Sequence, residues 1–375
     1  MKKLTNVITV IVTAVIVYLT GTRGMDYLDV FVDSSAPFEI WLLRLILVLV
    51  FFYAALFIQL ILHEGGHLVF GLATGYKFVS FRIMNFAWIR QGGKIVMKRY
   101  SVAGTGGQCL MAPPEETSAL PFVIYNMGGV LMNFITAAIS WLLYSAVSVP
   151  ALKMFFLLLC ASGVLLGLTN GLPLSTATVN NDGWNALSGL FNAGARRAFD
   201  DVLAINAGIS ENMRVKDIDE KYFRMPEDSE KNNSLISIEA VMLENRYMDE
   251  NRFEEAEEVI RRILEEGWDI PKIYAPLLKA DKVYIDILHQ KNLNEPAEFF
   301  NDKSAQKILK TMAGVPAVLR TRYAYEKYIL HQDISQIKRT WDRSRGSYPY
   351  LGEFETEGEL IRLLDETLEK NQETE

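Results

Sequence analysis

This 375-residue chain has only two cysteines and four histidines. The only cysteines are Cys109 and Cys160, and there is no Cys-x-x-Cys pair or Cys/His cluster. Two isolated thiols argue against a disulfide framework and against a zinc site built on thiolates.

Charge is missing from two long parts of the sequence. Between residues 40 and 62 the only charged residue is Arg44, and between residues 117 and 181 it is Lys153. From Gly183 onward Asp, Glu, Lys and Arg are frequent, so the composition divides near residue 185 into a membrane half and a water-facing half. The net charge of −7 and the absence of a basic stripe with interleaved aromatic residues argue against nucleic-acid binding.

Four apolar segments are candidates for membrane spans, which need about 20 residues each. They are Leu4–Thr20, residues 38 to about 73, Leu120–Val147 and Met154–Leu174. We expect the first to be a retained anchor, because "YLTGTRG" offers no A-x-A cleavage site; a cleaved signal peptide is the alternative. The second is too long for one upright span, so it tilts, extends beyond the bilayer or breaks at Gly65-Gly66.

Basic residues near the ends of spans predict the orientation. Residues 76–100 hold six basic residues and no acid, whereas the loop 21–37 holds Arg23 against three aspartates. This places residues 76–116 in the cytoplasm and residues 21–37 outside. Four spans then leave both termini in the cytoplasm, and we expect a multi-pass protein of a bacterial plasma membrane.

The stretch "ILHEGGHLVF" (residues 61–70) follows one of these apolar runs and contains an H-E-x-x-H motif. In a helix His63 and His67 share one face, where two imidazoles can hold one metal ion. Glu64 lies about 100° round the helix from His63, within reach of a metal-bound water, as a general base must be. The alternative is two histidines on a helix surface without a function, which the cost of burying polar groups in a membrane disfavours.

A catalytic zinc also needs a third protein ligand and an open position. After Glu116 the next acidic residue is Asp182, in "TNGLPLSTATVNNDGW". Taken alone, Asp182 is typical of a residue that caps the helix starting near Trp184 or shapes a turn. With His63 and His67 present, we expect its carboxylate to be the third ligand.

With "HEGGH" in an apolar helix followed by "NGLP" and "NDG", the sequence resembles the site-2 protease family of intramembrane zinc metalloproteases over about residues 38–185. The resemblance implies that His63, His67 and Asp182 bind Zn²⁺, that Glu64 is the catalytic base and that Asn170 binds the substrate backbone. The gap from Asn170 to Asp182 is longer than in the commonest family form. No PDZ-like or CBS-like insert is visible.

Asn133 is a second candidate for substrate binding. Gly129 and Asn133 resemble the family's G-x-x-x-N pattern, and Asn126 lies on the same helix face. Small residues let membrane helices approach closely and buried amides bond across them, so packing without a role in catalysis is the alternative.

Two β-rich runs flank Gly92-Gly93 in residues 76–100 and predict a hairpin. A sheet edge near the metal would pair with an extended peptide by strand addition. The alternative is a basic hairpin lying on anionic lipid. The Gly-rich stretch 103–109 lacks the Lys-Ser/Thr of a phosphate loop and is expected to be a loop.

The water-facing half predicts a cytoplasmic helical domain. Residues 234–267 resemble one tetratricopeptide-like helix pair. Later helices are expected at about 272–290, 304–312, 315–331, 334–343 and 355–369. Surfaces of this kind bind peptides or partner proteins.

The sequence thus predicts a mainly α fold: a polytopic membrane helix bundle with a small membrane-proximal β-hairpin, plus a cytoplasmic α-helical domain. The expected domains are an anchor with an external loop (1–37), a metalloprotease core (38–190) and the helical domain (191–375). The expected function is an intramembrane zinc endopeptidase that cleaves membrane-embedded or membrane-docked substrates near the cytoplasmic face. The rival is a catalytically inactive membrane scaffold or zinc sensor that acts through the helical domain.

Overall fold

The computed structural model describes residues 31–100, 105–175 and 180–374, together with positions 7, 10, 11, 14, 18 and 28. The expected span Leu4–Thr20 therefore lies mostly outside the described residues. The chain forms two compact units, one from residues up to 84 together with 106–196, and one from residues 85–105 together with 197–375.

Helix α2 (Phe38–Ala73) is one unbroken helix of 36 residues. It does not break at Gly65-Gly66, which removes one of the three alternatives for this span. At about 1.5 Å per residue it is about 54 Å long, well beyond a hydrocarbon core of about 30 Å. It must therefore tilt or project from a bilayer. Near its start, Arg44 lies 3.6 Å from the carboxylate of Asp33.

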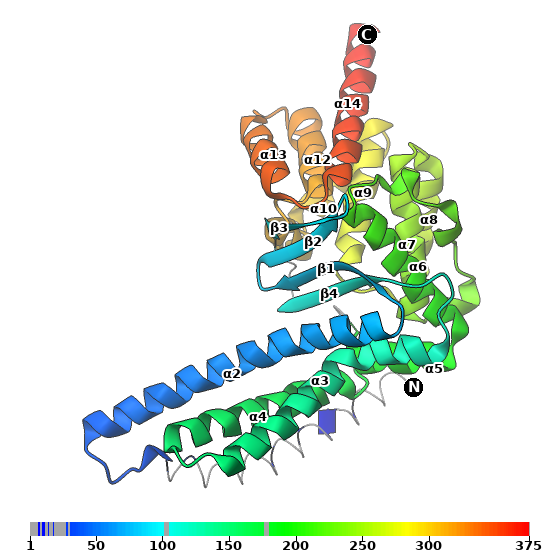
Figure 1. Ribbon diagram of the computed structural model, residues 1–375. Coiled ribbons are helices and arrows are strands. Elements are labelled where there is room, and N and C mark those ends of the chain that lie inside the picture. The colour runs from blue at the N-terminus through cyan, green and yellow to red at the C-terminus, as the bar shows by residue number, and fades with distance from the viewer. Residues whose placement is uncertain are drawn as a thin grey trace. The chain divides into compact units, whose positions relative to one another are not determined.

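Helices α3 (Ala119–Ala146) and α4 (Pro150–Gly171) pack against α2 and against each other (Figure 1). Pro150 opens α4 at its first turn, where a missing N–H costs nothing. In the described part of the chain, α2, α3 and α4 are the three helices long and apolar enough to cross a membrane. The expected spans two to four are thus present as helices, while their orientation stays a prediction.

The first unit also holds strands β1 (Lys77–Ile83) and β4 (Gly107–Ala112), which pair antiparallel, and the short helix α5 (Asp182–Phe191). The expectation that residues 103–109 form a loop is wrong from Gly107 onward. Here the chain forms a strand that is bonded to β1 on one side and held by the Tyr125 hydroxyl, which donates to the Cys109 carbonyl at 3.1 Å.

The second unit contains the predicted hairpin. Strands β2 (Phe86–Gln91) and β3 (Lys94–Arg99) pair antiparallel around Gly92 and Gly93, whose φ values are +57° and +75°. Two consecutive residues with positive φ are what a tight type I′ hairpin turn requires, and glycine adopts this conformation without strain.

The rest of the second unit is helical and encloses one hydrophobic core. Its helices are α6 (Ala193–Ser210), α7 (Ser234–Asp249), α8 (Phe253–Glu265), α9 (Tyr274–Leu288), α10 (Asn294–Asn301), α11 (Lys303–Thr311), α12 (Pro316–Ala324), α13 (Ser335–Ser347) and α14 (Leu351–Thr374). Short 3₁₀ turns η1 (Val215–Asp217), η2 (Glu220–Tyr222) and η3 (Asp228–Glu230) precede α7, and a π-helical turn η4 (Tyr325–Ile329) follows α12.

The mainly helical fold with a small amount of antiparallel sheet is confirmed. The expected helix pair appears as α7 and α8, which pack together, but its assignment as a tetratricopeptide-like repeat stays a prediction. Two helices were not predicted from the sequence: α6, with 18 residues, and α10, with eight.

Candidate metal centre

Two imidazoles meet on one face of α2. His63 and His67 are one turn apart and are only 7% and 9% exposed. Their Nε2 atoms lie 3.3 Å from each other. The spacing in the sequence therefore places two nitrogen atoms at one buried point, as predicted.

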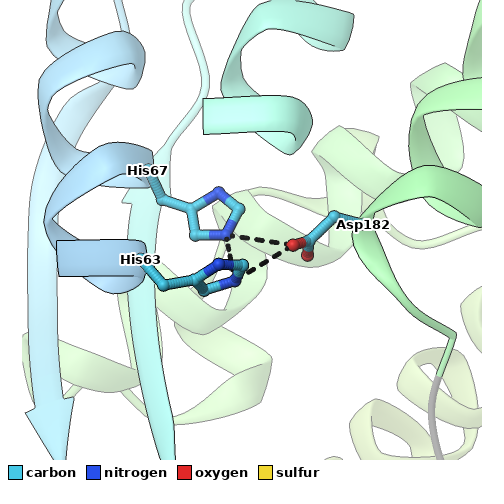
Figure 2. Close-up of side chains that lie close together, drawn as sticks. All are labelled: His63, His67 and Asp182. Carbon is cyan, nitrogen blue, oxygen red and sulfur yellow. Dashed lines mark hydrogen bonds and ion pairs between the residues drawn. The ribbon is translucent and has the colours of Figure 1, made fainter. Parts of the chain in front are cut away.

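Asp182 joins them from the start of α5. Its Oδ2 atom lies 3.1 Å from Nε2 of His63 and 3.4 Å from Nε2 of His67, and the three side chains point toward one another (Figure 2).

The alternative role of Asp182 as a helix cap is wrong, because Asn181 caps α5. The Asn181 side-chain oxygen accepts hydrogen bonds from the N–H groups of Trp184 and Leu174, each at 2.9 Å. Its amide nitrogen donates to the carbonyls of Thr169 (2.8 Å) and Leu172 (2.6 Å). Asn181 thus ties the end of α4 to the start of α5 and fixes the position of the next residue, Asp182.

Each imidazole is oriented by an acceptor on its other nitrogen. Nδ1 of His63 lies 2.7 Å from the side-chain oxygen of Asn133, and Nδ1 of His67 lies 2.9 Å from the carbonyl oxygen of Tyr125. Because both partners accept hydrogen bonds, each Nδ1 carries the hydrogen and each Nε2 keeps its lone pair. This is the arrangement found around metal-binding histidines.

The orientation of the Asn133 amide is itself fixed. Its nitrogen donates to Gln59, to the side-chain oxygen at 2.8 Å and to the carbonyl at 3.0 Å. The oxygen of Asn133 is therefore the atom that faces His63. Gln59 is completely buried one turn before His63 on α2. Gln59 was not predicted as part of the site, although a glutamine in so apolar a run is a signal of a buried polar contact.

The three donor atoms fit a zinc ion. Two imidazole lone pairs and a carboxylate oxygen that face one another repel unless a cation lies between them. In a tetrahedral zinc site with bonds of about 2.0–2.1 Å, ligand atoms are about 3.3–3.4 Å apart. The separations found here are 3.1, 3.3 and 3.4 Å. Among the described residues, His63, His67 and Asp182 form the one group of three such ligands.

Close helix packing brings α3 against this centre. A Cβ atom on Gly129 would lie 2.6 Å from Nε2 of His67 and 2.6 Å from Cε1 of His63. On α2, Gly65 and Gly66 lie between the two histidines. A Cβ atom on Gly66 would lie 2.3 Å from the carbonyl oxygen of Gly128, whereas one on Gly65 would meet nothing within 4 Å. Of the two glycines in "HEGGH", only Gly66 is needed for the helix contact.

Glu64 is buried beside the centre and is not one of the three ligand residues. Strand β4 runs directly over it: a Cβ atom on Gly107 would lie 2.6 Å from Oε1 of Glu64. The glycine thus leaves room for the carboxylate, and the backbone of β4 comes within contact distance of the expected catalytic base.

Two of the remaining candidates bond within their own helices. The Asn170 amide donates to the Leu166 carbonyl at 3.0 Å, and the Asn126 amide to the Phe122 carbonyl at 3.0 Å. Cys109 is buried in β4 and is not part of the ligand group in the described residues. Substrate binding by Asn170 and by Asn133 stays a prediction.

The comparison with protein families decides the wider identity. The family model described as "Peptidase family M50" matches residues 51–356, which include both histidines, Glu64 and Asp182. The chain belongs to peptidase family M50. The expected site-2 protease relationship is thereby confirmed, since M50 members are membrane metallopeptidases of that type. Comparisons with curated proteins and with solved structures gave no match.

Proposed function

We propose that this M50 member is a zinc endopeptidase that hydrolyses peptide bonds of membrane-embedded or membrane-docked substrates near the cytoplasmic face. The observation that supports it most directly is the meeting of His63, His67 and Asp182 at separations suited to zinc, beside a buried Glu64 that is left free of that cluster.

In this proposal His63, His67 and Asp182 hold the ion through Nε2, Nε2 and Oδ2. Zinc held there would supply the positive charge that polarises a scissile carbonyl and acidifies the attacking water. Glu64 accepts the proton of that water on its carboxylate and delivers it to the leaving amine. Asn133 and the Tyr125 carbonyl keep the two imidazoles in the tautomer and orientation that ligation needs.

The substrate binds as an extended strand along β4. In a helix the scissile carbonyl is hydrogen-bonded within the chain, so a transmembrane substrate must unwind before it is attacked. β4 is bonded to β1 along one edge and, in the part of the chain that the structure describes, to no strand along the other. Its backbone passes over Glu64 at Gly107, so a peptide added to this edge would lie next to the base.

Substrate trapping tests this function. The Glu64→Gln chain keeps the three ligands and loses the base, so it should bind substrate without cleaving it. Cross-linking of this variant in its native membrane should enrich a membrane protein or peptide that wild type processes. Enrichment of the same molecules with no change in their length between wild-type and variant membranes would instead support an inactive scaffold.

A further inference from the structure

The helical unit contains a cavity of about 220 Å³ that is separate from the metal centre. Its lining residues come from α6, α7, α9, α12 and α14 and from the segments between them, all within residues 205–357. Much of its wall is apolar, with Ile205, Ile209, Met242, Leu277 and Val315. Met213, which is 39% exposed, and the exposed Asn245 also line it, so it reaches the surface.

The charged groups that line this cavity do not balance. Four carboxylates face it, those of Glu244, Asp281, Glu353 and Glu357, and the only cationic side chain among the lining residues is Arg320. Arg320 is 1% exposed and forms ion pairs with Asp281 and with Glu357, the latter at 2.9 Å. Glu353 accepts a hydrogen bond from the Tyr348 hydroxyl at 2.6 Å. The Arg320 guanidinium is thus shared by Asp281 and Glu357, and Glu353 has only the neutral hydroxyl of Tyr348 as a donor.

Glu244 has no hydrogen-bond donor among the described residues. It is 0% exposed, it lines the cavity, and in the described residues neither of its carboxylate oxygens has a hydrogen-bond donor. A buried carboxylate with no donor is among the costliest groups that a fold can contain. Burial accordingly raises the pKa of Glu244 well above its usual value and that of Glu357 to about 7. The cavity therefore needs either protons or a cation.

We propose that this cavity binds an organic cation, in which an apolar chain carries a primary ammonium or a guanidinium that donates to Glu244. Such a head group offers several N–H donors to oxygens that have none, and its methylene chain suits the apolar wall. An inorganic divalent ion would instead need several oxygen ligands around one point. Among the described residues the four carboxylates do not form such a group, and Asp281, Glu357 and Glu353 already have donors.

A cationic head group on an apolar chain can come from two sources, a basic side chain of a peptide or a free alkylamine. Titration calorimetry of the full-length Glu64→Gln protein in detergent distinguishes them with three probes. These are a blocked Leu-Lys-Leu tripeptide, 1,5-diaminopentane, and the matched Leu-norleucine-Leu tripeptide, which has no charge. Tighter binding of the lysine tripeptide than of the diamine assigns the cation to a peptide, and the reverse order assigns it to a free amine.

The expected result is saturable binding of one cation per chain, at least tenfold weaker in Glu244→Gln. Glu239→Gln is the matched control, because Glu239 is a buried glutamate of the same helix that pairs with Arg197 and does not line the cavity. Ala317→Leu narrows the cavity without changing a charge and should also weaken binding tenfold or more. The proposal is overturned if neither cation binds, if the norleucine peptide binds equally well, or if Glu244→Gln and Ala317→Leu both bind like wild type.

Discussion

The side-chain oxygen of Asn133 lies 2.7 Å from Nδ1 of His63, and both are buried. This contact links α3 to the expected zinc ligand on α2 and holds the imidazole with Nε2 toward Asp182. It gives Asn133 a definite structural task, the positioning of a ligand, whatever it contributes to substrate binding.

We expect Asn133→Ala to weaken zinc binding by about 10- to 100-fold, because the loss of a ligand's supporting hydrogen bond has an effect of that size. Competition with a chromophoric chelator measures the change. Asn126→Ala is the control, since Asn126 is also buried on α3 but donates to the Phe122 carbonyl. Equal zinc affinity of Asn133→Ala and wild type would show that His63 is oriented without Asn133.

The two adjacent glycines of "HEGGH" should respond in opposite ways to alanine. Gly65→Ala places its methyl in open space and should keep activity, with a gain in helix stability of up to about 1 kcal/mol. Gly66→Ala drives a methyl into the backbone of Gly128 and should separate α2 from α3, with loss of zinc and of proteolysis. Zinc content and thermal unfolding of the two purified variants check this; similar behaviour of both would contradict the helix contact.

Asn181→Ala should release zinc although Asn181 is not a ligand. It removes four hydrogen bonds that hold the segment before Asp182, two accepted and two donated. Asn192→Ala is the matched control, because Asn192 also accepts a bond from a helix N–H, that of Ala195, but lies at the opposite end of α5 from Asp182. We expect at least a tenfold loss of zinc affinity in the first variant and none in the second.

The stability of the helical unit should fall as the pH rises toward neutrality. Burial raises the pKa values of Glu353 and Glu357 to about 7, with Tyr348 and Arg320 opposing the shift. The folded state therefore binds protons more tightly than the unfolded state, so this contribution is complete below about pH 4.5 and is lost as the pH rises through 7. Glu244 and Asp281 face the same cavity and shift in the same direction.

Glu353 and Glu357 should each lower the free energy of unfolding by on the order of 1 kcal/mol as the pH rises from 5.5 to 7.5. Thermal unfolding of the Glu64→Gln protein, followed by circular dichroism, should give a lower midpoint at the higher pH. Glu357→Gln should make the midpoint less dependent on pH. A midpoint that rises over this interval, or an unchanged dependence in the variant, would count against a proton held at Glu357.

The three candidate metal ligands could be predicted from the sequence because their signals are local or chemically rare. The H-E-x-x-H spacing alone places His63 and His67 together, and Asp182 was the next acid after a long uncharged stretch. Helix α2 was readable for the same reason, since a run of apolar residues has few alternatives to a membrane span.

What the sequence did not reveal depends on contacts between distant residues. Gln59 and Asn133 are 74 positions apart, and only the packing of α2 on α3 brings them together. Strand β4 begins at a glycine, follows a Gly-rich stretch and shows no clear alternation, so its pairing with β1 could not be predicted from residues 103–112. The cap at Asn181 was missed because two asparagines precede Asp182, and each of the three is a good capping residue.

A reconstituted cleavage assay with parallel zinc analysis tests the central claim most directly. Full-length wild type and Glu64→Gln are placed in liposomes with a membrane substrate obtained by trapping, and zinc is measured on the same samples. The account predicts one zinc per chain in both, with cleavage by wild type and none by Glu64→Gln. Cleavage by Glu64→Gln at the wild-type rate, or cleavage by a wild-type sample that contains no zinc, would contradict it.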